Sequence, residues 1–238
     1  MSKPLILVVN DDGITAPGIR ALANAVKHLG EVVIVAPDTG QSGMGHAITI
    51  SKPLRLTPVD SFDGMKAYQC SGTPVDCVKL AVDKVLHRKP DLCVSGINHG
   101  SNSSINIIYS GTMSAAVEAS LEGIPSVGFS LCDYRHDADF APAAHYAGLI
   151  AEQILKHGQQ ANTLLNVNIP KLPLNEIKGI KVGRQAQAKW VEEYLERTDP
   201  FGRPYYWLTG KFVNYDQGHD TDEFALANGY VSVVPVQH

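Results

Sequence analysis

Two adjacent carboxylates stand directly after the first apolar run of the chain. The run is Leu5–Val9, and the segment that follows it reads Asn10-Asp-Asp-Gly13. Two carboxylates would repel a phosphate, so an anionic ligand could bind beside them only with a bridging cation. Asn, Asp and Gly are also common turn residues, and a simple turn is the alternative interpretation. The position at the end of a buried strand favours a functional role.

Two later loops carry further oxygen donors. Pro37–His46 holds Ser42 among flexible residues, which allow its hydroxyl and nearby amides to approach a ligand. Ser95–Asn102 follows a second apolar run and presents the amide side chains of Asn98 and Asn102. Each loop alone also fits ordinary turn chemistry.

A fourth loop, Tyr109–Ala116, leads into a helix of small residues. Ser110, Gly111 and Thr112 stand at the start of this helix. Free backbone amides and the positive end of the helix dipole make such a position a natural anion site. Ser and Thr also cap helices routinely, and both roles are compatible.

The donor atoms indicate which metal would bind. Oxygen donors alone suit Mg²⁺ or Mn²⁺ rather than zinc, and they are offered by Asp11, Asp12, Ser42 and Asn98. The nine histidines show no H-x-x-x-H or H-E-x-x-H spacing. His46 and His99 fall in the proposed site, either as proton donors to a leaving group or as polar loop residues.

Alternating strand and helix patterns must position these loops. Strands are predicted at 5–9, 31–36, 91–95, 126–130 and 164–169, helices at 17–29, 74–86, 112–121 and 141–156, and a hairpin around 47–56. This order predicts a Rossmann-like, doubly wound α/β fold with a mostly parallel sheet. Loops that follow parallel strands meet at one sheet edge, so the four loops should lie together.

The last third of the chain has a different composition. We expect a catalytic core at 1–183 and an extension at 184–238, with a hairpin arm of about 184–215 followed by a terminal helix and strand. The arm is rich in aromatic residues, namely Trp190, Tyr194, Tyr205, Tyr206 and Trp207. An isolated two-stranded hairpin is marginal in water, and aromatics are enriched at interface cores. The arm therefore predicts a homodimer.

Composition excludes several classes of protein. The 238 residues carry a net charge of −4, which disfavours a nucleic-acid-binding face and predicts no stable nucleic-acid partner. The longest apolar runs are far shorter than the ~18 residues of a membrane span, so no membrane association is expected. No secretory signal is recognisable, which makes a cytoplasmic location the expectation. The four cysteines lack C-x-x-C spacing and are predicted to be structural thiols.

The motifs taken together resemble the SurE survival-protein family of metal-dependent nucleotidases. The resemblance rests on Asn10–Gly13, Gln41–Gly43, Ser95–Asn98 with Asn102, Tyr109–Thr112, Ala115–Glu118, Thr221-Asp222 and Gly229–Ser232. It implies a Rossmann-like core that hydrolyses 5′- and 3′-nucleoside monophosphates with one divalent ion per subunit, Mg²⁺ or Mn²⁺. It also implies an exchanged C-terminal arm, with dimers and tetramers, and short polyphosphate as a further substrate.

The resemblance assigns roles to individual residues. The metal ligands would be Asp11, Asp12, Ser42 and Asn98, and the phosphate contacts Asn102, Ser110, Gly111 and Thr112. Asp11, Asp12 and Asn98 would be the catalytic residues. The chain departs from the family pattern at Ser104-Ile-Asn106, where many members have Gly-x-Asp, and at Met44-Gly-His46. These departures leave substrate preference open.

Other functions fit parts of the pattern. A receiver-like Mg²⁺-binding signalling module also has an acidic pair after its first strand, but it needs a phosphorylatable Asp where this chain has Ser95-Gly96. A phosphatase of the D-x-D type is weakened because Asp11 and Asp12 are adjacent. A phosphatase for non-nucleotide monoesters is a further alternative. The leading hypothesis is a metal-dependent phosphomonoesterase in which water attacks phosphorus directly.

Overall fold

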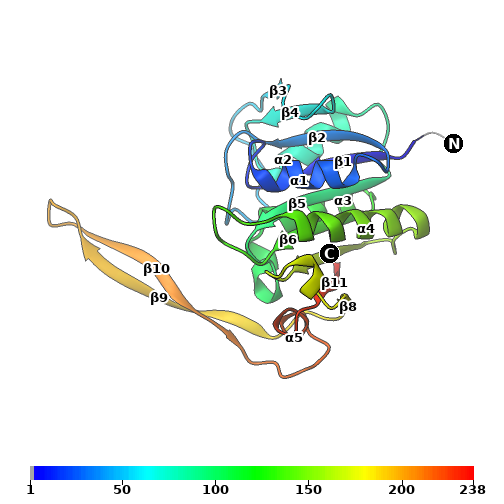
Figure 1. Ribbon diagram of the computed structural model, residues 1–238. Helices are drawn as coiled ribbons and strands as arrows, with labels where there is room; N and C mark the ends of the chain where they lie inside the picture. The colour runs from blue at the N-terminus through cyan, green and yellow to red at the C-terminus, as the bar shows by residue number, and fades with distance from the viewer. Residues whose placement is uncertain (1–2) are drawn as a thin grey trace.

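Apolar, β-branched segments form the centre of a nine-stranded sheet (Figure 1). The computed structural model describes residues 3–238. The strand order is β3-β4-β2-β1-β5-β6-β7-β11-β8. The strand bounds are β1 Leu5–Val9, β2 Glu31–Pro37, β3 Leu56–Pro58, β4 Lys66–Cys70, β5 Leu92–His99, β6 Ser126–Leu131, β7 Thr163–Ile169, β8 Ile180–Val182 and β11 Val231–Gln237.

The central strands run parallel, as the sequence predicts. β4, β2, β1, β5, β6 and β7 pair in parallel, whereas β3 is antiparallel to β4 and β11 is antiparallel to β7. The chain leaves β1 in one direction to form β2 and returns to its other side to form β5. Ligands of doubly wound sheets bind at such a reversal, outside the carboxyl ends of the strands. The prediction of a mostly parallel, doubly wound α/β fold is confirmed.

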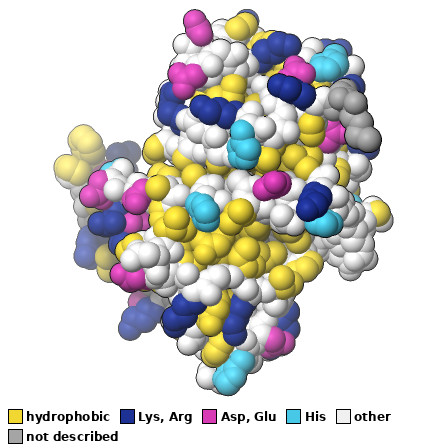
Figure 2. Space-filling view, turned by 45° about the vertical axis from the view of Figure 1, so that its right-hand side comes forward, with side chains coloured by type: hydrophobic (Ala, Val, Ile, Leu, Met, Phe, Trp, Pro, Cys, Tyr) yellow, Lys and Arg dark blue, Asp and Glu magenta, His cyan; other side chains and the backbone are white. Residues whose placement is uncertain are grey.

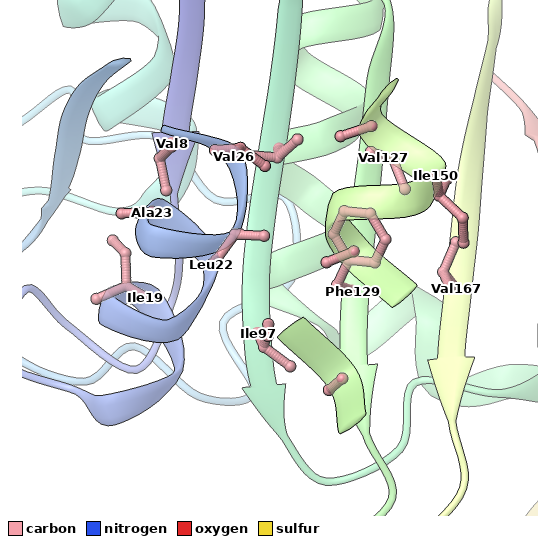
Figure 3. Close-up of a cluster of buried hydrophobic side chains, with 14 of the residues drawn as sticks. Val8, Ile19, Leu22, Ala23, Val26, Ile97, Val127, Phe129, Ile150 and Val167 are labelled. Atoms are coloured by element: carbon pink, nitrogen blue, oxygen red, sulfur yellow. The ribbon is translucent and has the colours of Figure 1, made fainter. Parts of the chain in front are cut away.

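Helices cover both faces of the sheet. α1 (Pro17–Val26) and α4 (Ala141–His157) pack on one face, and α2 (Pro74–Leu80) and α3 (Gly111–Leu121) on the other. β1 supplies both cores, because successive side chains of a strand point to opposite faces. Ile6 and Val8 join the α1/α4 core, while Leu5, Leu7 and Val9 join the α2/α3 core. Figure 3 shows Ile19, Leu22 and Val26 of α1 directed at the strands.

Several elements differ from their predicted extents. α1 ends at Val26, and α2 ends at Leu80 before one π-helical segment, η1 (Ala81–Val85). β5 continues to His99, so Asn98 lies in the strand rather than in a loop. The remaining short helices are η2 (Ser104–Tyr109) and η3 (Leu174–Glu176).

The prediction of a hairpin around 47–56 is wrong. Residues 38–55 form a loop without strands, and β3 begins only at Leu56. The start of α2 takes up backbone groups of this loop: the Thr73 hydroxyl donates to the Ala47 carbonyl at 2.7 Å, and the Thr49 amide donates to Asp76 Oδ1 at 3.1 Å. These two contacts hold residues 47 and 49 against α2 in place of a partner strand.

A long arm leaves the core near the end of the chain. β9 (Ala188–Thr198) and β10 (Pro204–Asn214) form an isolated antiparallel pair that projects from the molecule (Figure 1). The predicted hairpin is therefore present. The predicted terminal helix is α5 (Asp222–Ala227), and the terminal strand β11 enters the core sheet between β7 and β8. Of the C-terminal segment, the hairpin alone stands clear of the core.

The surface carries exposed apolar groups in two regions. Figure 2 shows hydrophobic side chains gathered on the face where α4 lies, with His and basic side chains around them. The arm adds a second set of exposed aromatic residues, namely Tyr194, Phe201, Tyr206 and Trp207. Among residues 3–238, no helix is long and apolar enough to cross a membrane. Cys70, Cys77, Cys93 and Cys132 are free thiols.

Candidate active site

A cavity of about 200 Å³ lies beside the carboxyl ends of β1 and β5. Asp11 and Asp12 follow β1, and Asn98 lies at the end of the adjacent β5. The cavity is lined by Asp11, Ser42, Gly43, Asn98, His99, Ser101, Asn102, Asn106, Tyr109 and Ser110. Residues from all four predicted loops therefore meet at one place.

Asp11 is a buried carboxylate held by the start of α3. The Thr112 hydroxyl donates to Asp11 Oδ1 at 2.5 Å, and the Asp11 side chain is only 3% exposed. Burial raises the pKa of Asp11, while the Thr112 hydroxyl and the amides of Gly111 and Thr112 act to lower it. A Cβ on Gly111 would lie 2.6 Å from the Cβ of Asp11. The close approach of α3 to Asp11 therefore requires glycine.

Asp12 stands beside Asp11 and is half-buried. It accepts the backbone N–H of His99 at 3.2 Å, which ties the end of β1 to the end of β5. Burial raises the pKa of Asp12 to about 6, and the negative charge of Asp11 adds to the effect. Both carboxylates are thus poorly compensated within the protein, and a bound cation would stabilise their charged forms.

Asn98 is oriented by the irregular end of β5. The pairing of β5 with β6 shifts register between Ser95 and Asn98, and such bulges redirect side chains near functional sites. Asn98 Nδ2 donates to the Gly100 carbonyl at 2.8 Å. Asn98 Oδ1 lies 3.5 Å from the Thr112 hydroxyl, which also binds Asp11. The Asn98 amide oxygen and the Asp11 carboxylate therefore share one donor.

Ser42 reaches the cavity from the loop 38–55. The Gln41 amide donates to the Asp11 carbonyl at 2.8 Å, which fixes this loop against the end of β1. His46 Nε2 lies 2.9 Å from Glu118 of α3. Of the two histidines considered from sequence, His99 lines the cavity and His46 is engaged with Glu118 instead.

The predicted phosphate contacts separate into two groups. Asn102 and Ser110 line the cavity, and the Ser110 hydroxyl accepts the Met113 amide at 3.1 Å as the N-cap of α3. Thr112 is completely buried, and its hydroxyl is directed to Asp11 rather than into the cavity. Contacts from Gly111 and Thr112 to a phosphate would thus have to come from their backbone amides.

The side chains that hold Asn102 were not predicted from the sequence. Asn102 Nδ2 donates to Ser130 Oγ at 2.9 Å, and the backbone N–H of Asn102 donates to Asn168 Oδ1 at 2.8 Å. Asn166 Nδ2 in turn donates to the Asn102 carbonyl at 2.8 Å. The available signal was the pair of asparagines at alternate positions of the otherwise apolar strand β7, since buried polar groups need partners.

Asp222, the first residue of α5, belongs to one of the motifs of the resemblance but was given no role from sequence. It accepts the amides of Ser104 at 2.7 Å and Ala186 at 2.9 Å. Ser104 adopts a φ of 51°, a backbone conformation that favours glycine. Asp222 thereby stabilises the loop that continues from Asn102 and joins it to the base of the arm.

The donor set fits a hard divalent cation. Within residues 3–238, no group of three or more His, Cys, Asp or Glu side chains could hold a metal ion. The site offers two carboxylates with amide and hydroxyl oxygens, a combination typical of Mg²⁺ or Mn²⁺ rather than zinc. In the same part of the chain, the buried side-chain atoms without a hydrogen-bond partner are Asn10 Oδ1, Ser95 Oγ and His99 Nε2. Of these three residues, Asn10 directly follows β1, Ser95 lies within β5, and His99 at the end of β5 lines the cavity.

The sheet and the oxygen-lined cavity at its reversal point define a Rossmann-like α/β protein with a ligand site at its strand ends. Comparison with known proteins identifies the family. The sequence profile described as "Survival protein SurE" matches residues 6–192, and the chain belongs to the SurE family.

Relatives match over nearly their full length. A protein of Christiangramia forsetii named "5'-nucleotidase SurE" is 66% identical over 238 residues, covering 99% of this chain and 91% of the relative. A protein of Bacteroides thetaiotaomicron with the same name is 49% identical, and the match covers 98% of this chain and 90% of the relative. The crystal structure of a SurE protein from Aquifex aeolicus matches with a TM-score of 0.86 and 43% sequence identity. The match covers 98% of this chain and 93% of that protein.

Proposed function

We propose that this protein is a divalent-metal-dependent nucleotidase that hydrolyses 5′- and 3′-nucleoside monophosphates to nucleoside and phosphate. The names of the relatives support the reaction class. The observation that carries the proposal for this chain is the convergence of Asp11, Ser42 and Asn98 on one cavity beside the N-terminus of α3.

The proposed metal ligands are oxygen atoms of Asp11, Asp12, Ser42 and Asn98. A bound Mg²⁺ or Mn²⁺ would polarise the phosphoryl group and lower the pKa of a water molecule. The protein holds this set in place through the Thr112 hydroxyl on Asp11 and the His99 amide on Asp12. The raised pKa values of both carboxyls support a role in binding a cation.

The phosphate is proposed to lie between Asn102 and the start of α3. The positive end of the α3 dipole favours an anion there, and the backbone amides of Gly111 and Thr112, which also act on Asp11, would be shared with the phosphate. Asn102 adds an amide side chain held by Ser130. The Ser110 hydroxyl caps α3 and lacks an adjacent histidine base, which supports attack by water rather than by a serine.

Phosphate release from a panel of substrates tests this proposal. The panel comprises 5′- and 3′-nucleoside monophosphates, sugar phosphates and short polyphosphate, each with Mg²⁺, with Mn²⁺ and with chelator. We expect metal-dependent hydrolysis of the nucleoside monophosphates. Equal or faster hydrolysis of sugar phosphates would favour the alternative of a phosphatase for non-nucleotide monoesters.

We also propose that the arm joins two copies of the chain in a homodimer, which can pair further into a tetramer. Tyr194 is 68% exposed and Trp207 is 62% exposed on a two-stranded element that makes no sheet with the core. Such a pair of strands is marginally stable alone in water, and a second subunit would bury these aromatic rings.

A further inference from the structure

A buried carboxylate with no part in the proposed chemistry lies on α3. The Glu118 side chain is 5% exposed, and a charge at that depth is costly unless partners compensate it. Two side chains do so, one at each oxygen: Lys79 Nζ lies 2.5 Å from Oε1, and His46 Nε2 lies 2.9 Å from Oε2. The carboxylate thereby joins three segments, namely α3, α2 and the loop 38–55.

Glu118 lies on the same side of α3 as the contact with Asp11. Gly111, Ala115 and Glu118 are spaced by four and then three residues, which places them in one row along the helix. Gly111 packs against the Asp11 side chain, and Ala115 is buried in the α2/α3 core. The helix that directs its N-terminus at the site therefore also carries, two turns further on, an attachment point for the loop 38–55.

The part of this loop that carries Ser42, here called the Ser42 segment (residues 41–46), is held at its start. The Gln41 amide donates to the Asp11 carbonyl at 2.8 Å. Beyond it, Gly43 has a φ of 74°, and a Cβ there would meet nothing within 4 Å. Glycine in such an open position is conformationally permissive, so packing around Gly43 does little to fix Ser42.

The end of the Ser42 segment depends on Gly45 and His46. The Gly45 amide donates to the Tyr109 carbonyl at 3.3 Å, which is long for an N–H···O bond. The contact between His46 and Glu118 is 2.9 Å long, and hydrogen bonds to an ionised group are roughly twice as strong as neutral ones. We propose that His46 is a positioning residue that holds the Ser42 segment on the site through Glu118. The inference rests on the proposed function, in which Ser42 is a metal ligand.

This role differs from proton donation to a leaving group. His99 is part of the lining of the cavity beside β1 and β5, whereas His46 is not. The Nε2 atom of His46 is already engaged with Glu118. A positioning residue should affect metal binding and the order of the loop, whereas a proton donor would affect turnover and leave both unchanged.

Calorimetric titration of Mn²⁺ into metal-stripped, full-length protein tests the inference. His46→Ala removes the contact to the loop but leaves Glu118 paired with Lys79, so the variant should fold. We expect it to raise the Kd for Mn²⁺ about tenfold, as groups that orient metal ligands do when they are lost. His46→Gln, whose amide N–H can donate to Glu118, should bind Mn²⁺ within about threefold of wild type.

Lys79→Met is the matched control. It removes the other partner of Glu118, which belongs to α2 rather than to the loop. Because His46 remains in place, this variant should bind Mn²⁺ within about threefold of wild type. Hydrogen exchange of residues 38–50 in metal-free protein, followed by mass spectrometry, reports on the loop itself. Exchange should be faster than in wild type in His46→Ala and unchanged in His46→Gln and Lys79→Met.

The outcomes separate this inference from the proposed function. Wild-type Mn²⁺ affinity or unchanged hydrogen exchange in His46→Ala would overturn the positioning role. An equal loss of affinity in Lys79→Met or in His46→Gln would overturn it as well. A wild type that binds Mn²⁺ but hydrolyses no nucleoside monophosphate would instead refute the proposed function, and the role of His46 in metal binding would stand.

Discussion

Thr112 affects the site from behind Asp11, without reaching the cavity. Its hydroxyl donates to Asp11 Oδ1 and lies 3.5 Å from Asn98 Oδ1. Groups that orient metal ligands typically contribute about 10–100-fold to metal affinity or activity. We therefore expect Thr112→Val to lower the apparent affinity for Mn²⁺ by about that factor, measured by calorimetry on metal-stripped protein.

Thr112→Ser is the control for this substitution. It keeps the hydroxyl and should bind Mn²⁺ within a few-fold of wild type, because the hydrogen bond to Asp11 can still form. Wild-type Mn²⁺ affinity in Thr112→Val would show that the hydroxyl does not orient a metal ligand.

Asp12 should make the stability of the metal-free protein depend on pH. Its pKa is raised from 3.8 to about 6, so the folded state binds this proton more tightly than the unfolded state does. The resulting stabilisation is fully present below the unfolded pKa and is lost as pH rises through about 6. The raised pKa of Asp11 acts with the same sign.

Urea unfolding with chelator at about pH 3 and about pH 7, which bracket the two pKa values, measures this effect. Between these values the free energy of unfolding of wild type should fall relative to that of Asp12→Asn. Carboxyls with lowered pKa values, such as Asp133 and Asp216, are present in both proteins, so the difference reports Asp12 together with its coupling to Asp11. Parallel pH profiles for the two proteins would contradict the assignment.

At the scale of elements, the contact between α3 and the end of β1 decides the geometry of the site. A Cβ at position 111 would lie 2.6 Å from the Cβ of Asp11 and 3.0 Å from its Oδ2. Alanine is a better helix former than glycine, so Gly111→Ala should fold. It should nevertheless lower kcat/KM for a nucleotide at least tenfold, an estimate based on the sensitivity of catalysis to misplaced groups.

Thermal unfolding and kinetics on the same preparation check this prediction. The expected result is a single cooperative transition at a lower melting temperature, because the added Cβ must displace Asp11, together with the loss of activity. Wild-type kcat/KM in Gly111→Ala would mean that α3 can move away from Asp11 without consequence.

The sequence predicted the helices and strands that are recognisable from the pattern of apolar residues within one segment. The apolar run of β1 and the helical spacing in α1 identify a βα unit, and parallel strands necessarily bring their following loops to one edge. The placement of Asp11, Asn98, Ser42 and Asn102 around one cavity therefore agrees with the predicted edge.

Features that depend on tertiary contacts were not predictable in this way. Residues 47–56 were expected to form a hairpin, but the Ala47 carbonyl and the Thr49 amide are bonded to the start of α2. Thr112 was expected to contact phosphate, and only the folded chain shows its hydroxyl directed at Asp11. The supports of Asn102 come from β6 and β7, more than 25 residues away in the chain.

In the whole molecule, the arm is the element whose aromatic side chains a single subunit leaves exposed. Its distal aromatic residues are exposed, whereas its base contacts the core through Trp190 and Asn106. A variant that replaces residues 195–207 by Asn-Gly would keep the pairing of Tyr194 with Leu208 and close it with a two-residue turn. We expect this variant to be a monomer.

Sedimentation velocity at micromolar concentration distinguishes the assemblies. Wild type should sediment as a dimer or tetramer and the shortened variant as a monomer. A monomeric wild type, or an unchanged oligomer after shortening, would exclude the distal arm as the dimer contact.

In the proposed function, a divalent cation held at Asp11 drives phosphate release from nucleotides. The direct measurement is inorganic phosphate released from AMP by chelator-treated protein before and after Mn²⁺ is added, in wild type and in Asp11→Asn. We predict no release after chelation, recovery with Mn²⁺ in wild type, and a rate lower by about hundredfold or more in Asp11→Asn. Undiminished release without metal, or a wild-type rate in Asp11→Asn, would contradict the claim.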